Sequence, residues 1–184
     1  DRGGGGSTTT GVGLGEGKDG VLRLVQVDGD DGEARVQGDL FTELTKRLLR
    51  QVIASLPAGK HSPRIVLTSV PDELHVLGLL MAEALLALEG AECIPLGTQM
   101  PLLEIACAAS AHRADIVALS FSVAFPQRQI PSLLQQLRMV LPAEVALWAG
   151  GGGVRRLPEI AGVELLASLE RALDALAAWR RRQM

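Results

Sequence analysis

The sequence has no tyrosine, and aromatic residues of all kinds make up only 3% of its 184 residues. Proteins that bind single-stranded nucleic acid stack bases on exposed rings, so a chain this poor in rings does not fit that class. The formal net charge is −3, and the sequence lacks the basic surface with which a DNA-binding domain holds phosphates. We therefore expect no direct nucleic-acid binding by this fragment.

Long apolar runs and a leader sequence are also missing. No stretch reaches the roughly 18 apolar residues of a membrane-spanning helix. The N-terminus does not show the basic and then apolar pattern of a secretory signal peptide. The two cysteines, Cys93 and Cys107, do not stand at a metal-binding spacing, and we expect both to be reduced, buried and structural. These features predict a cytoplasmic protein without membrane contact.

Hydrophobic residues make up 47% of the chain, which is enough for one buried core and a small appendage. Residues 1–20 are rich in glycine, serine and threonine. Such a segment cannot bury enough apolar surface to order itself, so we expect a flexible linker there. This segment is interpreted either as a linker from a partner domain upstream or as a cloning scar.

Residues 21–60 are expected to form a partial helical segment. The stretch 21–27 fits a strand as well as a helix. Asp39 is then the predicted N-cap of a helix that runs to about Leu56, because apolar residues recur every four positions between them. This helix is interpreted as the possible remnant of a helical bundle.

Residues 61–184 are predicted to form the main domain, because short apolar stretches alternate there with amphipathic ones. Strands are predicted at 64–69, 92–96, 115–121, 144–149 and 163–166. Helices are predicted at 76–89, 101–111, 129–140 and 168–182. Strands that alternate with helices in this way indicate an α/β domain with a five-stranded parallel sheet and helices on both faces.

A parallel sheet of this kind binds ligands at the carboxyl ends of its strands, near the point where strand order reverses. The residues that follow the predicted strands include His75, Gly97, Ser122 and Gly150. His75 is the most unusual of them, because it lies between a strand and a helix with an acidic residue before it and a glycine after it. Alone it fits a solvated loop histidine, but its place among the other strand ends makes it a candidate ligand. His61, expected in a loop, and His112, expected at a helix end, are interpreted as solvated or capping residues.

Three motifs at these strand ends resemble those of the cobalamin-binding domain family. They are Glu73-x-His75-x-x-Gly78 after the first strand, Ser120-Phe121-Ser122 at the end of the third, and Gly150-Gly151 at the end of the fourth. The family pattern is Asp-x-His-x-x-Gly, then Ser-x-Leu or Ser-x-Thr, then Gly-Gly, on a flavodoxin-like sheet. Glu73 stands where the pattern has Asp, and Ser122 where it has Leu or Thr. The resemblance covers about residues 63–184 and is greatest to the sensory half of MerR-like and light-dependent transcriptional regulators.

The resemblance implies specific roles for these residues. In the family a histidine imidazole replaces the cofactor's own benzimidazole base below the cobalt ion, which assigns His75 as the lower axial ligand. Glu73 would hold the second ring nitrogen, because a ligating imidazole must be neutral and fixed in one tautomer. Gly78 would leave room at the start of the helix for the displaced nucleotide tail. The tail would then pass small residues that allow close approach: Ser120, Ser122, Gly150 and Gly151.

The function implied by the resemblance is a cobalamin-binding sensory domain that belongs to, or acts beside, a transcriptional regulator. Its partner would be a helical or DNA-binding domain in the same chain or a separate protein, and a homo-oligomer is compatible with it. Two alternatives stay open on the same fold: a corrinoid carrier for a methyltransferase, and a haem-binding or cofactor-free protein-interaction module. The sequence shows no catalytic pair, so we do not expect an enzyme.

Overall fold

The computed structural model describes residues 10–16, 22–28, 33–56 and 61–183. The chain divides into two compact units, Asp1–Leu48 and Leu49–Met184. Every candidate cofactor-binding residue predicted from the sequence lies in the second unit. None of the helices within the described ranges combines the length and the hydropathy that crossing a lipid bilayer requires.

The first unit contains an antiparallel pair of strands, β1 (Thr10–Glu16) and β2 (Leu22–Asp28). Strand β1 falls within residues 1–20, and the prediction of a flexible linker is therefore wrong for Thr10–Glu16. Glycine alternates there with threonine, valine and leucine, which favour strands. A single strand leaves its backbone groups unpaired, and β2 supplies the hydrogen-bond partners for β1. Residues 1–9 and 17–21 lie outside the described part of the chain.

Helix α1 (Glu33–Ser55) begins earlier than the sequence predicts. Asp39 lies inside it and is therefore not its N-cap. The residues before Asp39 are mostly good helix formers, and Gly38 costs the helix only about 1 kcal/mol relative to alanine. The predicted end near Leu56 is confirmed to within a residue.

The second unit is built on five parallel strands: β3 (His61–Thr68), β4 (Ala91–Gly97), β5 (Ile116–Ser120), β6 (Ala146–Gly150) and β7 (Val163–Leu166). Their order across the sheet is β4-β3-β5-β6-β7, and every pairing is parallel. The predicted five-stranded parallel sheet is confirmed. From β3 the chain first adds β4 on one side and then returns to add β5 on the other side of β3. Strand order therefore reverses between β3 and β5.

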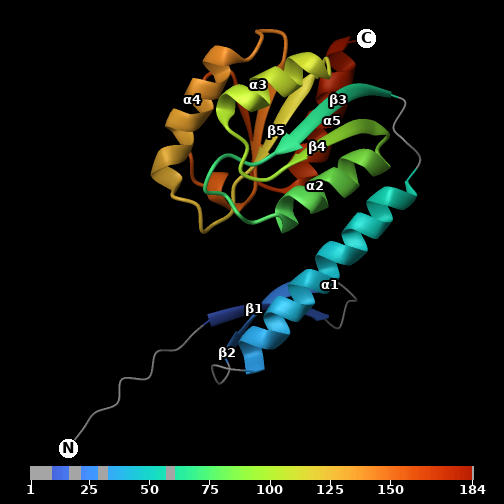
Figure 1. Cartoon of the computed structure of the whole chain (residues 1–184), viewed down its shortest axis with the longest axis vertical. Helices are drawn as coiled ribbons and strands as arrows, with labels where there is room; N and C mark the ends of the chain where they lie inside the picture. Colours follow the sequence, from blue (N-terminus) through green and yellow to red (C-terminus); the bar gives the residue numbers. More distant parts are fainter. Residues whose placement is uncertain (1–9, 17–21, 29–32, 57–60, 184) are drawn as a thin grey trace, which may run out of the picture. The chain divides into compact units, whose positions relative to one another are not determined.

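Two layers of helices cover the sheet (Figure 1). Helices α2 (Leu77–Leu88) and α5 (Leu169–Gln183) lie on one face, and α3 (Leu102–Ala111) and α4 (Ile130–Val140) lie on the other. Alternate residues of each strand enter the two cores: Val117 packs with the α3 and α4 side, and Ile116 with the α2 and α5 side. This double burial explains why the strands read as almost unbroken apolar runs.

The structure corrects two predictions: Cys107 is not buried, and His61 is not in a loop. Both cysteines are free, but Cys107 is exposed, because α3 buries Ile105 and Ala109 and the position between them points to the opposite side. His61 begins strand β3 instead of lying in a loop. His112 is exposed at the C-terminal end of α3, as expected.

The two thiols are expected to differ in reactivity. Burial, together with the neighbouring Glu83 carboxylate, raises the pKa of Cys93 to about 12. At about pH 8 only about one Cys93 in 10⁴ is then a thiolate, which is the reactive form. In folded protein iodoacetamide should label Cys107 and spare Cys93, whereas both should be labelled in urea, as peptide mass spectrometry would show. Equal labelling of both in folded protein would contradict this shielding.

Candidate functional site

The loop after β3 places an acid and a histidine at the carboxyl edge of the sheet. Asp72 adopts a left-handed backbone conformation (φ 68°), which aspartate tolerates better than most residues. The Ser69 hydroxyl donates to the Glu73 carbonyl at 2.9 Å and holds the turn closed. As a result the Glu73 side chain is 1% exposed, while the His75 side chain is 61% exposed.

Glu73 joins this loop to the loop that follows β5. Its Oε1 accepts a hydrogen bond from the His75 backbone N–H at 2.9 Å and lies 2.9 Å from His75 Nδ1. Its Oε2 accepts a hydrogen bond from the Ser122 backbone N–H at 2.7 Å. The Ser122 hydroxyl lies 3.1 Å from the same His75 Nδ1. Three residues predicted from the sequence therefore form one hydrogen-bonded cluster at the point where strand order reverses.

The geometry of the cluster decides what the imidazole can do. The carboxylate and the hydroxyl both approach Nδ1, so they do not flank the ring as the acid and nucleophile of a serine hydrolase do. A proton on Nδ1 donated to Glu73 leaves the lone pair on Nε2, and no residue in the described ranges binds Nε2. In that tautomer the exposed ring leaves Nε2 available to a group from outside the described residues.

A metal at this position would depend on ligands from elsewhere. Among the described residues no group of three or more histidine, cysteine, aspartate or glutamate side chains could hold an ion. His75 thus offers a single coordination position.

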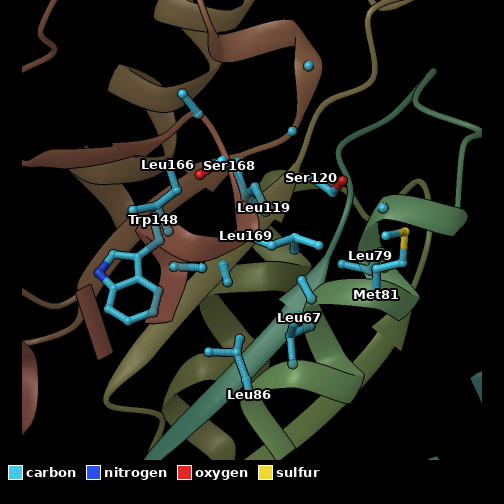
Figure 2. A pocket seen from close by; sticks show the side chains of 18 of the residues that line it. Leu67, Leu79, Met81, Leu86, Leu119, Ser120, Trp148, Leu166, Ser168 and Leu169 are labelled. Atoms are coloured by element: carbon cyan, nitrogen blue, oxygen red, sulfur yellow. The ribbon is translucent and has the colours of Figure 1, made fainter. Parts of the chain in front are cut away.

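A cavity of about 350 Å³ opens beside the cluster, between the sheet and helices α2 and α5 (Figure 2). The other four residues predicted for the site all line it: Gly78, Ser120, Gly150 and Gly151. Gly97 does not line it; it ends β4 elsewhere on the same edge.

Gly78 sets how closely α2 approaches the sheet. A Cβ at this position would lie 3.2 Å from Ser120 Oγ, tighter than ordinary contact. The glycine therefore lets the first turn of α2 pass close to the end of β5. A larger side chain here would push against the serine at the mouth of the cavity.

Comparison with known proteins gives one sequence relative. No family model matches the sequence. Over 119 residues, which are 65% of this chain, it is 30% identical to the HTH-type transcriptional repressor CarH of Myxococcus xanthus. The matched region is 40% of the repressor, so the chain spans about two fifths of the length of this relative.

Two solved structures share the architecture of the chain. The monomethylamine corrinoid protein of Methanosarcina barkeri superposes with a TM-score of 0.60 at 18% identity, over 79% of this chain and 70% of that protein. The methanol:cobalamin methyltransferase complex MtaBC of the same organism gives a TM-score of 0.55 at 16% identity, over 79% of this chain and 55% of that one. The domain has the flavodoxin-like fold of cobalamin-binding proteins. The haem alternative has no support from these comparisons.

The sequence prediction missed the apolar lining of the cavity. Leu67, Ala118 and Trp148 come from the middle of three strands, where apolar residues are indistinguishable from ordinary core. Strand periodicity was the available signal, because Ala118 and Trp148 stand two residues before Ser120 and Gly150 and so share their face. The loop from Leu166 to Leu169, which also lines the cavity, carried no recognisable motif.

The charge of Glu73 should make the stability of this flavodoxin-like domain depend on pH. Burial acts to raise the pKa of Glu73, but hydrogen bonds from the backbone and side chains of Ser122 and His75 outweigh it and hold the pKa below the usual 4.5. Because the unfolded chain takes up the proton first, this stabilisation is present above pH 4.5 and is lost as pH falls through the lower, folded value.

Glu73→Gln tests this dependence, because glutamine keeps the shape and removes the charge. At about pH 7 we expect cofactor-free Glu73→Gln to be about 1–3 kcal/mol less stable than the natural chain in urea unfolding. The reason is that the glutamine NH₂ group would face a backbone N–H that now donates to a carboxylate oxygen. At about pH 3 the difference should shrink. A gap of the same size at both pH values would rule out the carboxylate charge as its source.

Proposed function

We propose that this domain binds a cobalamin, with His75 Nε2 as the lower axial ligand of cobalt, and that it is the sensory part of a transcriptional regulator. The proposal is carried by the cluster of Glu73, His75 and Ser122, which fixes Nδ1 and presents Nε2 outward at the strand-order reversal. The predicted fold and the similarity to a repressor support it.

The residues present fit this cofactor. A corrin macrocycle holds cobalt with its own nitrogens and needs one further ligand from below, which matches the single coordination position of His75. Glu73 is a methylene longer than the aspartate of the family pattern, yet its two oxygens reach both His75 and Ser122. When bound, the cofactor would supply a cobalt ion whose upper ligand can change; the protein's own part is to hold the imidazole neutral and oriented.

The cavity fits the second requirement of the cofactor, a place for the displaced nucleotide tail. Gly78 and Ser120 stand at its mouth, beside the histidine loop. Gly150 and Gly151 line the side contributed by β6. We propose that the tail enters between these residues and lies between the sheet and helices α2 and α5.

A sensory role is favoured over a methyl-carrier role by the sequence relative. The sequence relative, at 30% identity, is a transcriptional repressor. The corrinoid protein structures are less than 20% identical to this chain, so their similarity supports only the fold. A helical or DNA-binding partner domain, a homo-oligomeric state and a cytoplasmic location stay predictions. No residue pair in the cluster has the geometry of a hydrolytic site, and we propose that the domain binds and does not catalyse.

Cofactor uptake tests the proposal directly. Purified protein is mixed with hydroxocobalamin in the dark, desalted and scanned between the ultraviolet and the visible. We expect the cofactor to elute with the protein in equal amounts, with a spectrum changed by replacement of its lower base. A colourless protein fraction would refute the proposal. Transfer of a methyl group to bound cob(I)alamin by a methyltransferase and its methyl donor would support the carrier role instead.

A further inference from the structure

A run of buried polar residues leads into the loop that carries His75. Among the described residues four polar or charged side chains are buried, and three of them fall within residues 68–73: Thr68, Ser69 and Glu73. Burial of a polar group costs free energy unless it is hydrogen-bonded, so the side chains in this stretch depend on their partners. We infer, on the basis of the proposed cobalamin binding, that Ser69 is a positioning residue for the ligand. Its buried hydroxyl anchors the Glu73–His75 pair to the loop after β4.

The Ser69 hydroxyl bonds to two different loops. Ser69 is 0% exposed, so water cannot replace either partner. The hydroxyl donates to the Glu73 carbonyl at 2.9 Å and accepts a hydrogen bond from the Gln99 backbone N–H at 3.0 Å. Because a hydroxyl has a single proton to donate, the bond to Glu73 fixes its direction and leaves its lone pairs for Gln99. One side chain therefore links the loop after β3 with the loop after β4.

The loop after β4 has a constrained backbone where Ser69 meets it. Gly97 and Gln99 both have a positive φ, 84° and 61°. A residue other than glycine keeps such a conformation only where its surroundings impose it. The Met100 N–H donates to the backbone carbonyl of Ser69 at 2.8 Å, so two successive amides of this loop bind Ser69. Ser69 is thus anchored to a loop whose shape is itself fixed.

Ser69 acts on the imidazole through Glu73. The Glu73 N–H donates to the Val70 carbonyl at 3.2 Å, and its carbonyl accepts from Ser69, so both backbone groups of this residue are held. The carboxylate is in this way placed to contact the His75 ring and to accept from the Ser122 N–H. Without the hydroxyl, the Glu73 carbonyl loses its partner and the carboxylate is free to shift. Loss of a group that orients a metal ligand costs about 10- to 100-fold in affinity, and a group one bond further away should lie at the lower end of that range.

Ser69→Ala and Thr68→Val form a matched pair of variants, because each removes one buried hydroxyl. Thr68 is also 0% exposed, and its hydroxyl donates to the Gly97 carbonyl at 2.9 Å without a bond to Glu73 or His75. Both variants should therefore lose stability toward urea. In titrations with hydroxocobalamin followed by absorbance, we expect Ser69→Ala to bind about 10-fold more weakly than the natural chain. Thr68→Val should bind as the natural chain does.

A second measurement needs no cofactor and reports directly on the position of the Glu73 carboxylate. The backbone N–H groups of His75 and Ser122 both donate to this carboxylate. In cofactor-free Ser69→Ala we expect these two amides to exchange with solvent deuterium at least about 10-fold faster relative to the amides of β5, as followed by NMR. The β5 amides lie between two paired strands and report any general loss of stability. In Thr68→Val this ratio should equal that of the natural chain.

Unchanged affinity of a folded Ser69→Ala protein would overturn the positioning role, whether or not its amides exchange faster. An equal loss of affinity in Thr68→Val would overturn it too, because any buried hydroxyl at this edge would then have the same effect. If the natural chain takes up no cobalamin, the proposed function fails, and the exchange ratio alone decides whether Ser69 positions Glu73. Should Ser69→Ala not fold, Ser69→Cys takes its place. Its thiol is a weak donor at the same position and should give a smaller change in the same direction.

Discussion

Replacement of His75 by alanine is expected to weaken cobalamin binding by at least about 100-fold. Loss of a group that merely orients a metal ligand costs about 10- to 100-fold, so loss of the ligand itself should reach the upper end of that range or exceed it. The Glu73 carboxylate keeps its bonds to the backbone N–H groups of residues 75 and 122, so the loop should retain its shape. Any cofactor that remains should lack the absorbance change caused by histidine below cobalt.

His112→Ala is the matched control for that experiment. His112 is also exposed, but it lies at the end of α3, where its backbone carbonyl accepts a hydrogen bond from Arg64 at the start of the sheet. Alanine preserves this carbonyl, so affinity and spectrum should equal those of the natural chain. If His75→Ala instead binds hydroxocobalamin with unchanged affinity and spectrum, His75 is not the ligand.

Gly151→Ala is expected to lower the stability of the domain by about 3 kcal/mol. Gly151 has a φ of 96°, a conformation that an L-residue adopts only at a cost, and a Cβ there would lie 2.3 Å from the Phe121 carbonyl oxygen. Conformational strain and overpacking each cost about 1–3 kcal/mol. For a domain of this size the melting temperature should fall by about 6–12 °C in a thermal scan followed by circular dichroism.

Gly97→Ala separates the two causes of that loss. Gly97 also has a positive φ, 84°, but an added Cβ would meet no heavy atom within 4 Å. Only the conformational cost of about 1–2 kcal/mol should therefore remain. Equal losses in the two variants would show that contact with Phe121 is not what requires glycine at residue 151.

The sheet could be predicted from sequence because both of its faces are covered. Strands such as β5 are short apolar runs bounded by turn residues. Amphipathic helical segments separate them, so the type and the order of the elements can be predicted. The β1–β2 pair could not be predicted in the same way. Its glycine-rich first strand has the composition of a linker, and pairing with β2 is a property of the two segments together.

The motifs of the site and the contact between Glu73 and His75 were predicted, but its longer-range connections were not. The position of His75 at a strand end follows from the alternation of strands and helices. The bond from Ser122 to Glu73 joins residues 49 positions apart and depends on how two loops meet. The cavity depends on the register of β3, β5 and β6 and on the distance at which α2 and α5 pack, which no local pattern encodes.

The double attachment of Glu73 also has a mechanical consequence. One carboxylate oxygen of Glu73 contacts the His75 ring, and the other accepts a hydrogen bond from the backbone of the loop after β5. That loop in turn packs closely against the glycines that follow β6. A displacement of the His75 side chain would therefore act on the loop after β5 as well as on its own loop, because the same carboxylate is bonded to both.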